Sequence, residues 1–432
     1  MAAWLTAIAT LSLIALAVEN RPLLRSILGR SPTAITYPYE PTSQVDATQQ
    51  LQQEIAFYQT RIQQRPNDGL DRTALAQTYL KMARATGQTA WFLLAEKTAQ
   101  ESLKKLPFEN SVAVLVLAQV AEAKHDFSRS IQLAKQVLTE KPESDQALAL
   151  LVTGYLAQGK VSEAEAIAQP LSQMTPTLGT HLLGALTYAA QGKDSLAIAQ
   201  FEQALAREEP GETGSSARLR TLFGRFYAER GDLQQAQRLY REALRMVPQY
   251  PLAMVQLAEA EAQLGRYRRA HQLYSQVFTA GELATVVDHT ALAGLAELAQ
   301  LQGDRPKAKA LWDEAEKRLR AHPDLEGFGH RRELAQILLA RGDRADLPEA
   351  LDLMRREAQV RRDAQTLDTL AWALLETAIH SGTIDSGVTD SGVADSGVTD
   401  SQVTGTQNLQ AAAAIAQEAL QQNPNNAQLL YR

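Results

Sequence analysis

The chain has 432 residues, of which 45% are hydrophobic and only 6% aromatic, and its formal net charge at pH 7 is −6. This slightly acidic balance excludes a bulk electrostatic attraction to nucleic acid. The absence of cysteine excludes disulfide bonds and thiolate metal sites.

The first segment, residues 1–28, is predicted to be a hydrophobic anchor. Residues 2–18 carry no charge, and as a helix they would span about 26 Å, against about 30 Å for a bilayer core. Arg21, Arg25 and Arg30 follow this run, and such an excess of positive charge favours the cytoplasmic side. We therefore expect a single-pass membrane protein with cytoplasmic repeats, in contact with the membrane through residues 2–18.

Two other interpretations of this segment stay open. Ala15-Leu16-Ala17 fits a signal-peptide cleavage pattern, although a positively charged leading region is missing. Cleavage near Ala17 would release a periplasmic or secreted binding protein. The third interpretation is an amphipathic helix docked on the rest of the chain.

Residues 29–46 contain Pro32, Pro38 and Pro41 and predict an extended, proline-containing tether. A lone helix over residues 47–66 is expected to follow the tether and to cap the amino end of the next segment, because terminal units of stacked arrays are atypical.

The strongest pattern is a glycine that recurs with a period near 34 residues, which indicates a stack of similar small units. The glycines are Gly159, Gly192, Gly231, Gly265 and Gly303. The residues five positions later are Ala164, Ala197, Ala236, Ala270 and Ala308, and those four positions further on are Ala168, Phe201, Tyr240, Tyr274 and Trp312. A spacing of four residues places the two side chains of each unit on one helix face.

The unit at residues 217–250 shows the pattern most completely. Gly224 is small enough for the second helix of the unit to approach there, Gly231 suits a turn after a helix end, and Pro248 ends the second helix. The pattern resembles the tetratricopeptide repeat family, whose unit is a helix-turn-helix. The resemblance implies an all-α, right-handed superhelical α-solenoid of about nine units, preceded by one N-terminal hydrophobic helix.

The array is expected to cover residues 67–379, with two padded units and a split last unit. The first unit is predicted to turn at residues 86–89 between lengthened helices, and the unit from Phe328 is padded at Leu347-Pro348-Glu349. Residues 380–408 carry tandem Asp-Ser-Gly-Val-Thr-type pentads and predict a low-complexity loop rather than a calcium site. The last helix and C-terminal tail are expected at residues 409–432.

The sequence shows no constellation that would support catalysis. None of the seven histidines forms the His-Glu-x-x-His pattern of a helical zinc site, and no glycine-rich phosphate loop is present. We therefore expect no enzyme activity, no cofactor, no metal and no small-molecule substrate.

The resemblance implies that the first helices of the units line a concave groove that receives a partner peptide or helix. The corresponding positions are Val112, Leu115, Gln119, Gln146, Ala149, Thr153, Leu182, Leu186, Arg218, Thr221, Arg225, Leu252, Val255, Glu259, Ala293 and Glu297. They lack the Lys, Asn and Arg set with which chaperone-binding relatives clamp a carboxylate. The competing interpretation is that Val112, Leu115, Leu182 and Leu186 form core between neighbouring units.

A basic patch is expected between residues 216 and 270, because this segment contains ten arginines and only five acidic residues. It is predicted to bind an acidic partner segment or anionic lipid headgroups, and the alternative is a solvated surface. The residues assigned to the patch are Arg238, Arg241, Arg245, Arg266, Arg268 and Arg269.

Together these features predict a membrane-tethered scaffold or assembly factor that binds a protein partner in its groove. The alternatives are the periplasmic or secreted binding protein and an RNA-binding repeat protein. RNA binding is disfavoured, because the basic region lacks an aromatic platform for bases.

Overall fold

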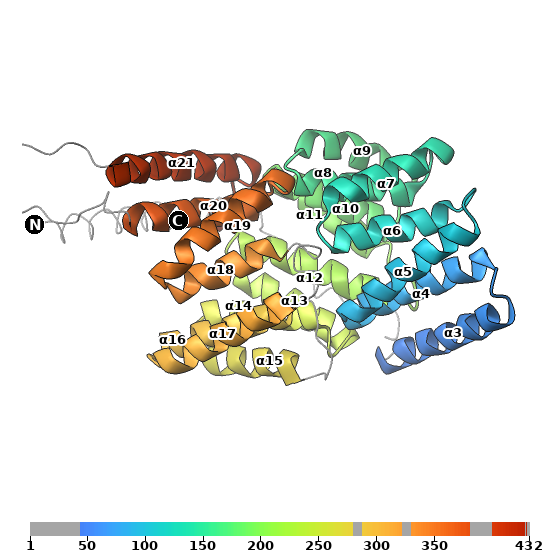
Figure 1. Ribbon diagram of the computed structural model, residues 1–432, viewed down its shortest axis with the longest axis horizontal. Coiled ribbons are helices and arrows are strands. Elements are labelled where there is room, and N and C mark those ends of the chain that lie inside the picture. Colours follow the sequence, from blue (N-terminus) through green and yellow to red (C-terminus); the bar gives the residue numbers. More distant parts are fainter. Residues whose placement is uncertain (1–43, 280–286, 322–329, 381–399, 428, 430–432) are drawn as a thin grey trace, which may run out of the picture. The chain divides into compact units, whose positions relative to one another are not determined.

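The computed structural model describes residues 44–279, 287–321, 330–380, 400–427 and 429, and within them nineteen α-helices and no β-strand. Helix α3 (Gln44–Gln64) precedes nine helix pairs (Figure 1). The first helices are α4 (Gly69–Thr86), α6 (Ser111–Ala123), α8 (Asp145–Ala157), α10 (Leu178–Ala190), α12 (Thr213–Glu229), α14 (Pro251–Gln263), α16 (Asp288–Leu301), α18 (Arg331–Arg341) and α20 (Ala364–His380). The second helices are α5 (Thr89–Lys105), α7 (Phe127–Glu140), α9 (Val161–Met174), α11 (Asp194–Leu205), α13 (Leu233–Met246), α15 (Tyr267–Thr279), α17 (Arg305–Ala321), α19 (Leu347–Val360) and α21 (Asp400–Gln422).

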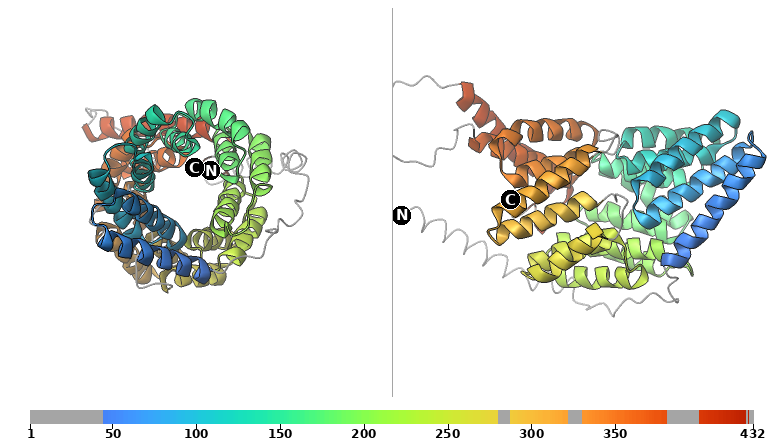
Figure 2. Two further views of the ribbon diagram at one scale, coloured as in Figure 1. Left: turned by 90° about the vertical axis from the view of Figure 1, so that its right-hand side faces the viewer. Right: turned by 60° about the horizontal axis from the view of Figure 1, so that its bottom comes forward.

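The pairs stack in chain order along a curved path (Figure 2). Each helix packs against the helices before and after it, and the first helices of successive pairs also contact one another. Second helices of successive pairs lie farther apart and make no contacts of comparable extent. Because the inner side of a curve is the shorter path, the first helices line the concave side of the stack. This arrangement confirms the predicted all-helical solenoid.

The repeated alanines and aromatic residues form the interface within each pair. Ala236 and Tyr240 of α13 are fully buried, and a Cβ atom added at Gly224 of α12 would lie 2.5 Å from Cε1 of Tyr240. A similar contact joins successive pairs, because a Cβ atom added at Gly294 of α16 would lie 2.3 Å from Cζ of Tyr274 of α15. The predicted role of Gly224 is confirmed, because the aromatic ring occupies the space that a side chain there would need.

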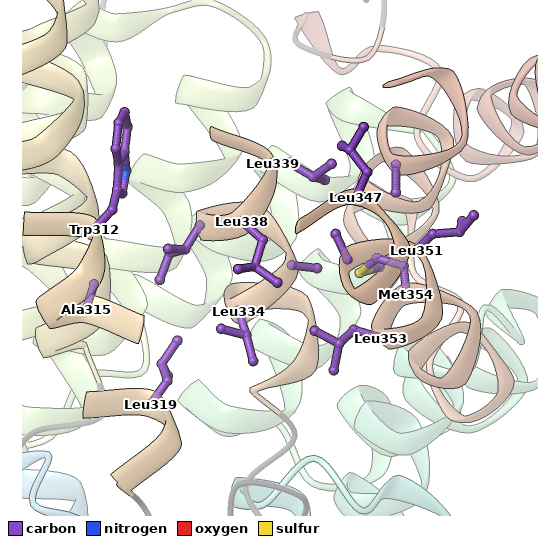
Figure 3. Close-up of a cluster of buried hydrophobic side chains, with 14 of the residues drawn as sticks. Trp312, Ala315, Leu319, Leu334, Leu338, Leu339, Leu347, Leu351, Leu353 and Met354 are labelled. Atoms are coloured by element: carbon purple, nitrogen blue, oxygen red, sulfur yellow. The ribbon is translucent and has the colours of Figure 1, made fainter. Parts of the chain in front are cut away.

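Packing between pairs is continuous, as the carboxyl-terminal half illustrates (Figure 3). Leu334 and Leu338 of α18 lie between Trp312 of α17 and Met354 of α19, and all four side chains are buried. Each helix therefore has apolar neighbours on both sides, which is how a stack of small units excludes water from its interior.

The structure confirms the predicted first padded turn, moves the second from Leu347-Pro348-Glu349, which begin α19, to the residues just before them, and corrects the start of the last helix. Helix α4 ends at Thr86 before Gly87, and a 3₁₀ turn at Arg344–Asp346 precedes α19. Helix α21 begins at Asp400, so residues 400–408 of the predicted loop are helical. The last pentad has Gln402 where the earlier pentads have glycine, and the loss of that glycine removes a helix-weakening residue.

A buried ion cluster fixes the connection between α11 and α12. Arg220 of α12 is completely buried and forms a two-point ion pair with Glu208 from the connecting segment. Its Nε atom lies 3.4 Å from the Glu242 carboxylate of α13. Burial raises the pKa of Glu242, and the neighbouring guanidinium opposes that shift. The cluster ties the connecting segment to both helices of the following pair.

The carboxyl-terminal pair contacts the turns of the middle pairs, and we call this contact the C-terminal seam. The seam joins residues 361–365 and 422–427 to residues 157–159, 192–194 and 229–231. The Arg362 backbone N–H donates to the Ala157 carbonyl at 2.8 Å, and Asn425 donates to the Gly192 carbonyl at 3.0 Å. Gln365 and Asn423 both donate to the Glu229 carboxylate. Figure 1 shows α20 and α21 beside the middle pairs. The seam closes the curved stack on itself.

The predicted single-pass membrane localisation is wrong in light of the described residues. No helix among them combines the length and the apolar character needed to cross a bilayer. Their apolar residues follow the helical repeat and alternate with polar ones, because each helix faces its neighbours on one side and water on the other. The predicted anchor at residues 2–18 and most of the tether lie outside the described residues.

We predict opposite effects for two glycine substitutions in α12. Gly224→Ala should lower the free energy of unfolding by about 1–3 kcal/mol, because its methyl group overlaps the Tyr240 ring. The methyl group of Gly214→Ala would have no atom within 4 Å. This substitution should raise the free energy of unfolding by up to about 1 kcal/mol, because alanine has the higher helix propensity. Urea unfolding followed by circular dichroism measures both, and equal effects would contradict the proposed helix contact.

Candidate partner-binding surfaces

The predicted groove residues divide by burial into core and surface positions. Leu115, Leu182, Thr221 and Val255 are buried, and Leu115 and Val255 belong to hydrophobic clusters between neighbouring helices. The half-buried or exposed positions are Val112, Gln119, Gln146, Ala149, Thr153, Leu186, Arg218, Arg225, Leu252, Glu259, Ala293 and Glu297. We call this second group the inner face, and it is carried by α6, α8, α10, α12, α14 and α16.

The inner face changes in character along the stack at equivalent positions of successive first helices. Gln119, Thr153 and Leu186 are uncharged, whereas Arg225, Glu259 and Glu297 bring one positive and two negative groups. Each of these side chains comes from a different helix, so the pattern depends on the stacking and not on any one unit. The inner face is thus neutral in its early units and charged in its later ones.

Glu259 is the most perturbed group of the inner face. Burial and the nearby Glu297 carboxylate raise the pKa of Glu259 to about 7, and Arg225 opposes the shift. Burial also raises the pKa of Glu297. Gln256 donates to Glu259 at 3.0 Å, but neither carboxylate forms an ion pair with another described residue. Two acidic groups are therefore held close together in surroundings that disfavour their charged form.

A further arginine that the sequence pattern did not reveal lies near the charged part of the inner face. Desolvation and the neighbouring Arg218 guanidinium lower the pKa of Arg84, on α4, and Glu122 of α6 opposes this shift. Arg84 and Arg218 are far apart in the sequence, so no periodic signal could have connected them. Neither makes an ion pair within the described part of the chain.

The predicted basic patch is divided in the structure. Arg241, Arg266, Arg268 and Arg269 line one surface hollow, which we call the arginine hollow, at the turn from α14 to α15. Arg238 instead lies 3.8 Å from Glu242. Arg245 is not a lining residue. The full lining consists of Gln234, Gln237, Arg241, Gly265, Arg266, Tyr267, Arg268 and Arg269.

Among the described residues, no group of three or more His, Asp or Glu side chains is arranged to hold a metal ion. The inner face, on the first helices, and the arginine hollow, on second helices and the turn before α15, are two candidate surfaces.

Comparison with known proteins agrees with this architecture. Residues 121–183 and 227–280 match the family model described as tetratricopeptide repeat. Tetratricopeptide repeat protein 8 of Caenorhabditis elegans is 27% identical over 237 residues, which make up 53% of this chain and 42% of that protein. The comparisons support the tetratricopeptide repeat family. The chain spans less than half the length of this curated relative.

Solved structures resemble the tetratricopeptide array in fold. The human IFIT1 dimer with m7Gppp-AAAA has a TM-score of 0.50 at 16% identity, covering 82% of this chain and 71% of that chain. A chain of the APC/C hetero-tetramer Cut9–Hcn1 has a TM-score of 0.48 at 15% identity, covering 84% of this chain and 62% of that chain. At such identities the first likeness shows the fold alone.

We predict that Glu259 makes stability depend on pH. Its pKa rises from about 4.5 in the unfolded chain to about 7 in the folded one, so its favourable contribution is complete below about pH 4.5 and is lost as pH rises through 7. The Glu259→Gln variant should therefore gain about 1–2 kcal/mol relative to the parent protein between pH 5 and pH 8, after allowance for partial hydration. Urea unfolding at several pH values tests this, and a constant difference would contradict the raised pKa.

Proposed function

We propose that the protein is a binding scaffold that holds a segment of a partner protein along its inner face. Proteins built from this repeat generally mediate protein–protein interactions and assembly. The described first helices offer a continuous row of half-buried and exposed side chains, whereas their buried neighbours hold the helices together. An extended segment or an amphipathic helix fits such a row, because it can contact one unit after another.

The observation that carries the proposal is the pair of inner-face carboxylates at Glu259 and Glu297, which lie on the successive first helices α14 and α16. Burial raises the pKa of both groups, and no described cation pairs with either. A lysine or arginine on a partner would favour their charged form and form short, charge-assisted hydrogen bonds. We therefore infer a partner segment with a basic residue against these carboxylates and uncharged residues against Gln119, Thr153 and Leu186.

The acidic pair also sets the direction of the bound segment. Arg225 lies on the preceding unit and is 3.7 Å from Glu229 in its own helix, so a basic partner residue is repelled there and attracted one or two units later. Charge complementarity of this kind selects register and partner more than it adds affinity.

We predict that removing the charges of the inner face weakens binding of the selected segment at least tenfold. The test uses peptides selected from a displayed random library against the whole protein, and fluorescence anisotropy measures their affinity. The triple variant Arg225→Ala/Glu259→Ala/Glu297→Ala should lose the affinity, since each tenfold step is about 1.4 kcal/mol.

The matched control is Glu163→Ala/Glu202→Ala/Lys309→Ala, which removes the same charges from exposed positions of second helices. It should bind the peptides as the parent protein does. Peptides that still bind the inner-face variant but do not bind the control variant would contradict the proposal.

A further inference from the structure

The arginine hollow lies outside the inner face and contains more positive charge than its surroundings neutralise. Arg241 and Arg266 share one carboxylate, that of the buried Glu261, at 2.7 and 3.2 Å. Arg268 and Arg269 are exposed, and no ion pair joins either of them to a carboxylate of the described chain. Three of the four positive charges in the hollow are therefore uncompensated locally.

A buried amide in the hollow has an unused hydrogen-bond donor. Gln237 of α13 is 4% exposed and lines the hollow. Its Oε1 atom accepts from Arg241 at 3.3 Å and from Arg266 at 3.2 Å, so its Nε2 atom is the remaining end. That Nε2 atom has no hydrogen-bond partner. Exchanging the two ends would turn the amide nitrogen toward two cations, so the arginines themselves fix this orientation.

A buried donor without an acceptor is unfavourable, and an acceptor supplied by a ligand would remove this penalty. Gln237 thus offers a donor at a place where the surrounding charge attracts an anion.

The start of α15 adds a third contribution. The first turn of a helix has backbone N–H groups without partners inside the helix. The second helices α13 and α17 satisfy one such group with a preceding aspartate, since Asp232 accepts from Gln235 and Asp304 from Lys307. Helix α15 follows Arg266, just as α9 follows Lys160 and α11 follows Lys193, and none of these side chains has an acceptor for a backbone N–H. The Arg269 N–H already donates to the Arg266 carbonyl at 3.0 Å. The Tyr267 and Arg268 N–H groups are therefore the first-turn donors that an anion in the hollow could use.

We propose that the arginine hollow is a binding site for a phosphoryl group carried on a partner protein. A phosphate dianion offers three acceptor oxygens, which match donors from Gln237, Arg266, Arg268 and Arg269 on α13 and on the turn before α15. A carboxylate has only two oxygens and one charge, so it leaves part of this set unused. The inference that a partner protein carries the phosphoryl group rests on the proposed scaffold function. The inference that the hollow binds a phosphoryl group does not.

The first test titrates the whole protein with inorganic phosphate, and with acetate as the carboxylate probe, at constant ionic strength. Amide signals of residues 237 and 266–269, followed by nuclear magnetic resonance, report binding. Phosphate should bind at least tenfold more tightly than acetate. Equal responses to phosphate, acetate and added chloride would overturn the site.

Two variants and one control assign the response to the hollow. Gln237→Glu keeps the side-chain shape but replaces the donor with a negative group, and Arg268→Ala/Arg269→Ala removes the uncompensated charge. Both should weaken phosphate binding at least tenfold. Arg245→Ala removes an exposed arginine of α13, the helix that carries Gln237, but Arg245 does not line the hollow. This variant should bind phosphate as the parent protein does. A loss equal in all three variants would overturn the proposal, because it would reflect overall charge only.

The second test separates free phosphate from a protein-borne group. A peptide with one phosphoserine should bind more tightly than inorganic phosphate and than the same peptide with glutamate, and Gln237→Glu should abolish the difference. A phosphopeptide that binds no better than free phosphate would overturn the protein-borne source. The inner-face triple variant should leave phosphate binding unchanged, so failure of the scaffold proposal and failure of the phosphoryl site are distinguishable.

Discussion

The C-terminal seam is the constraint on which the shape of the candidate surfaces depends. In a stack of helix pairs each unit contacts only its neighbours, and small rotations from pair to pair add up along the array. Here the Arg362 backbone and the Asn425 amide bond to the turns at Ala157 and Gly192. A Cβ atom at Gly192 would lie 2.5 Å from Pro424, and the left-handed backbone there also favours glycine. Curvature is thus fixed by contacts across the stack as well as along it.

Fixed curvature has direct consequences for both candidate surfaces. Burial raises the pKa of Glu259, and the Glu297 carboxylate adds to the rise. These two residues belong to different helices, so the distance between their carboxylates depends on how the pairs are stacked. The arginine hollow is more local, because α13, α14 and α15 are consecutive. A partner that engages both surfaces would gain effective concentration at the second from binding at the first. The two surfaces differ in charge, so such a partner would need a basic residue for the inner face and an anionic group for the arginine hollow.

Packing contacts that recur in each unit can be predicted from the sequence, whereas contacts that occur once in the fold cannot. The recurring glycine, alanine and aromatic positions predict the helix pairs, because packing such as that of Gly224 on Tyr240 is local and recurs in each unit. The seam contacts join residues between 136 and 233 positions apart, so no periodic pattern signals them. Arg220 looks like its exposed neighbour Arg218 in the sequence, and only the fold shows that Glu208 and Glu242 enclose it. The division of the groove residues into core and surface likewise depends on the helix rotation, which places Val255 in the core and Glu259 at the surface.

The most direct test of this account is the distance across the C-terminal seam. The chain has no cysteine, so spin labels can be placed at two exposed positions, Lys160→Cys beside the Gly159 turn and Gln421→Cys at the end of α21. Double electron–electron resonance should give a single, narrow distribution at short distance, and substitution of Asn425 and Pro424 by glycine should broaden it. A broad or long distribution in the otherwise unsubstituted protein would show an open stack and would contradict the account.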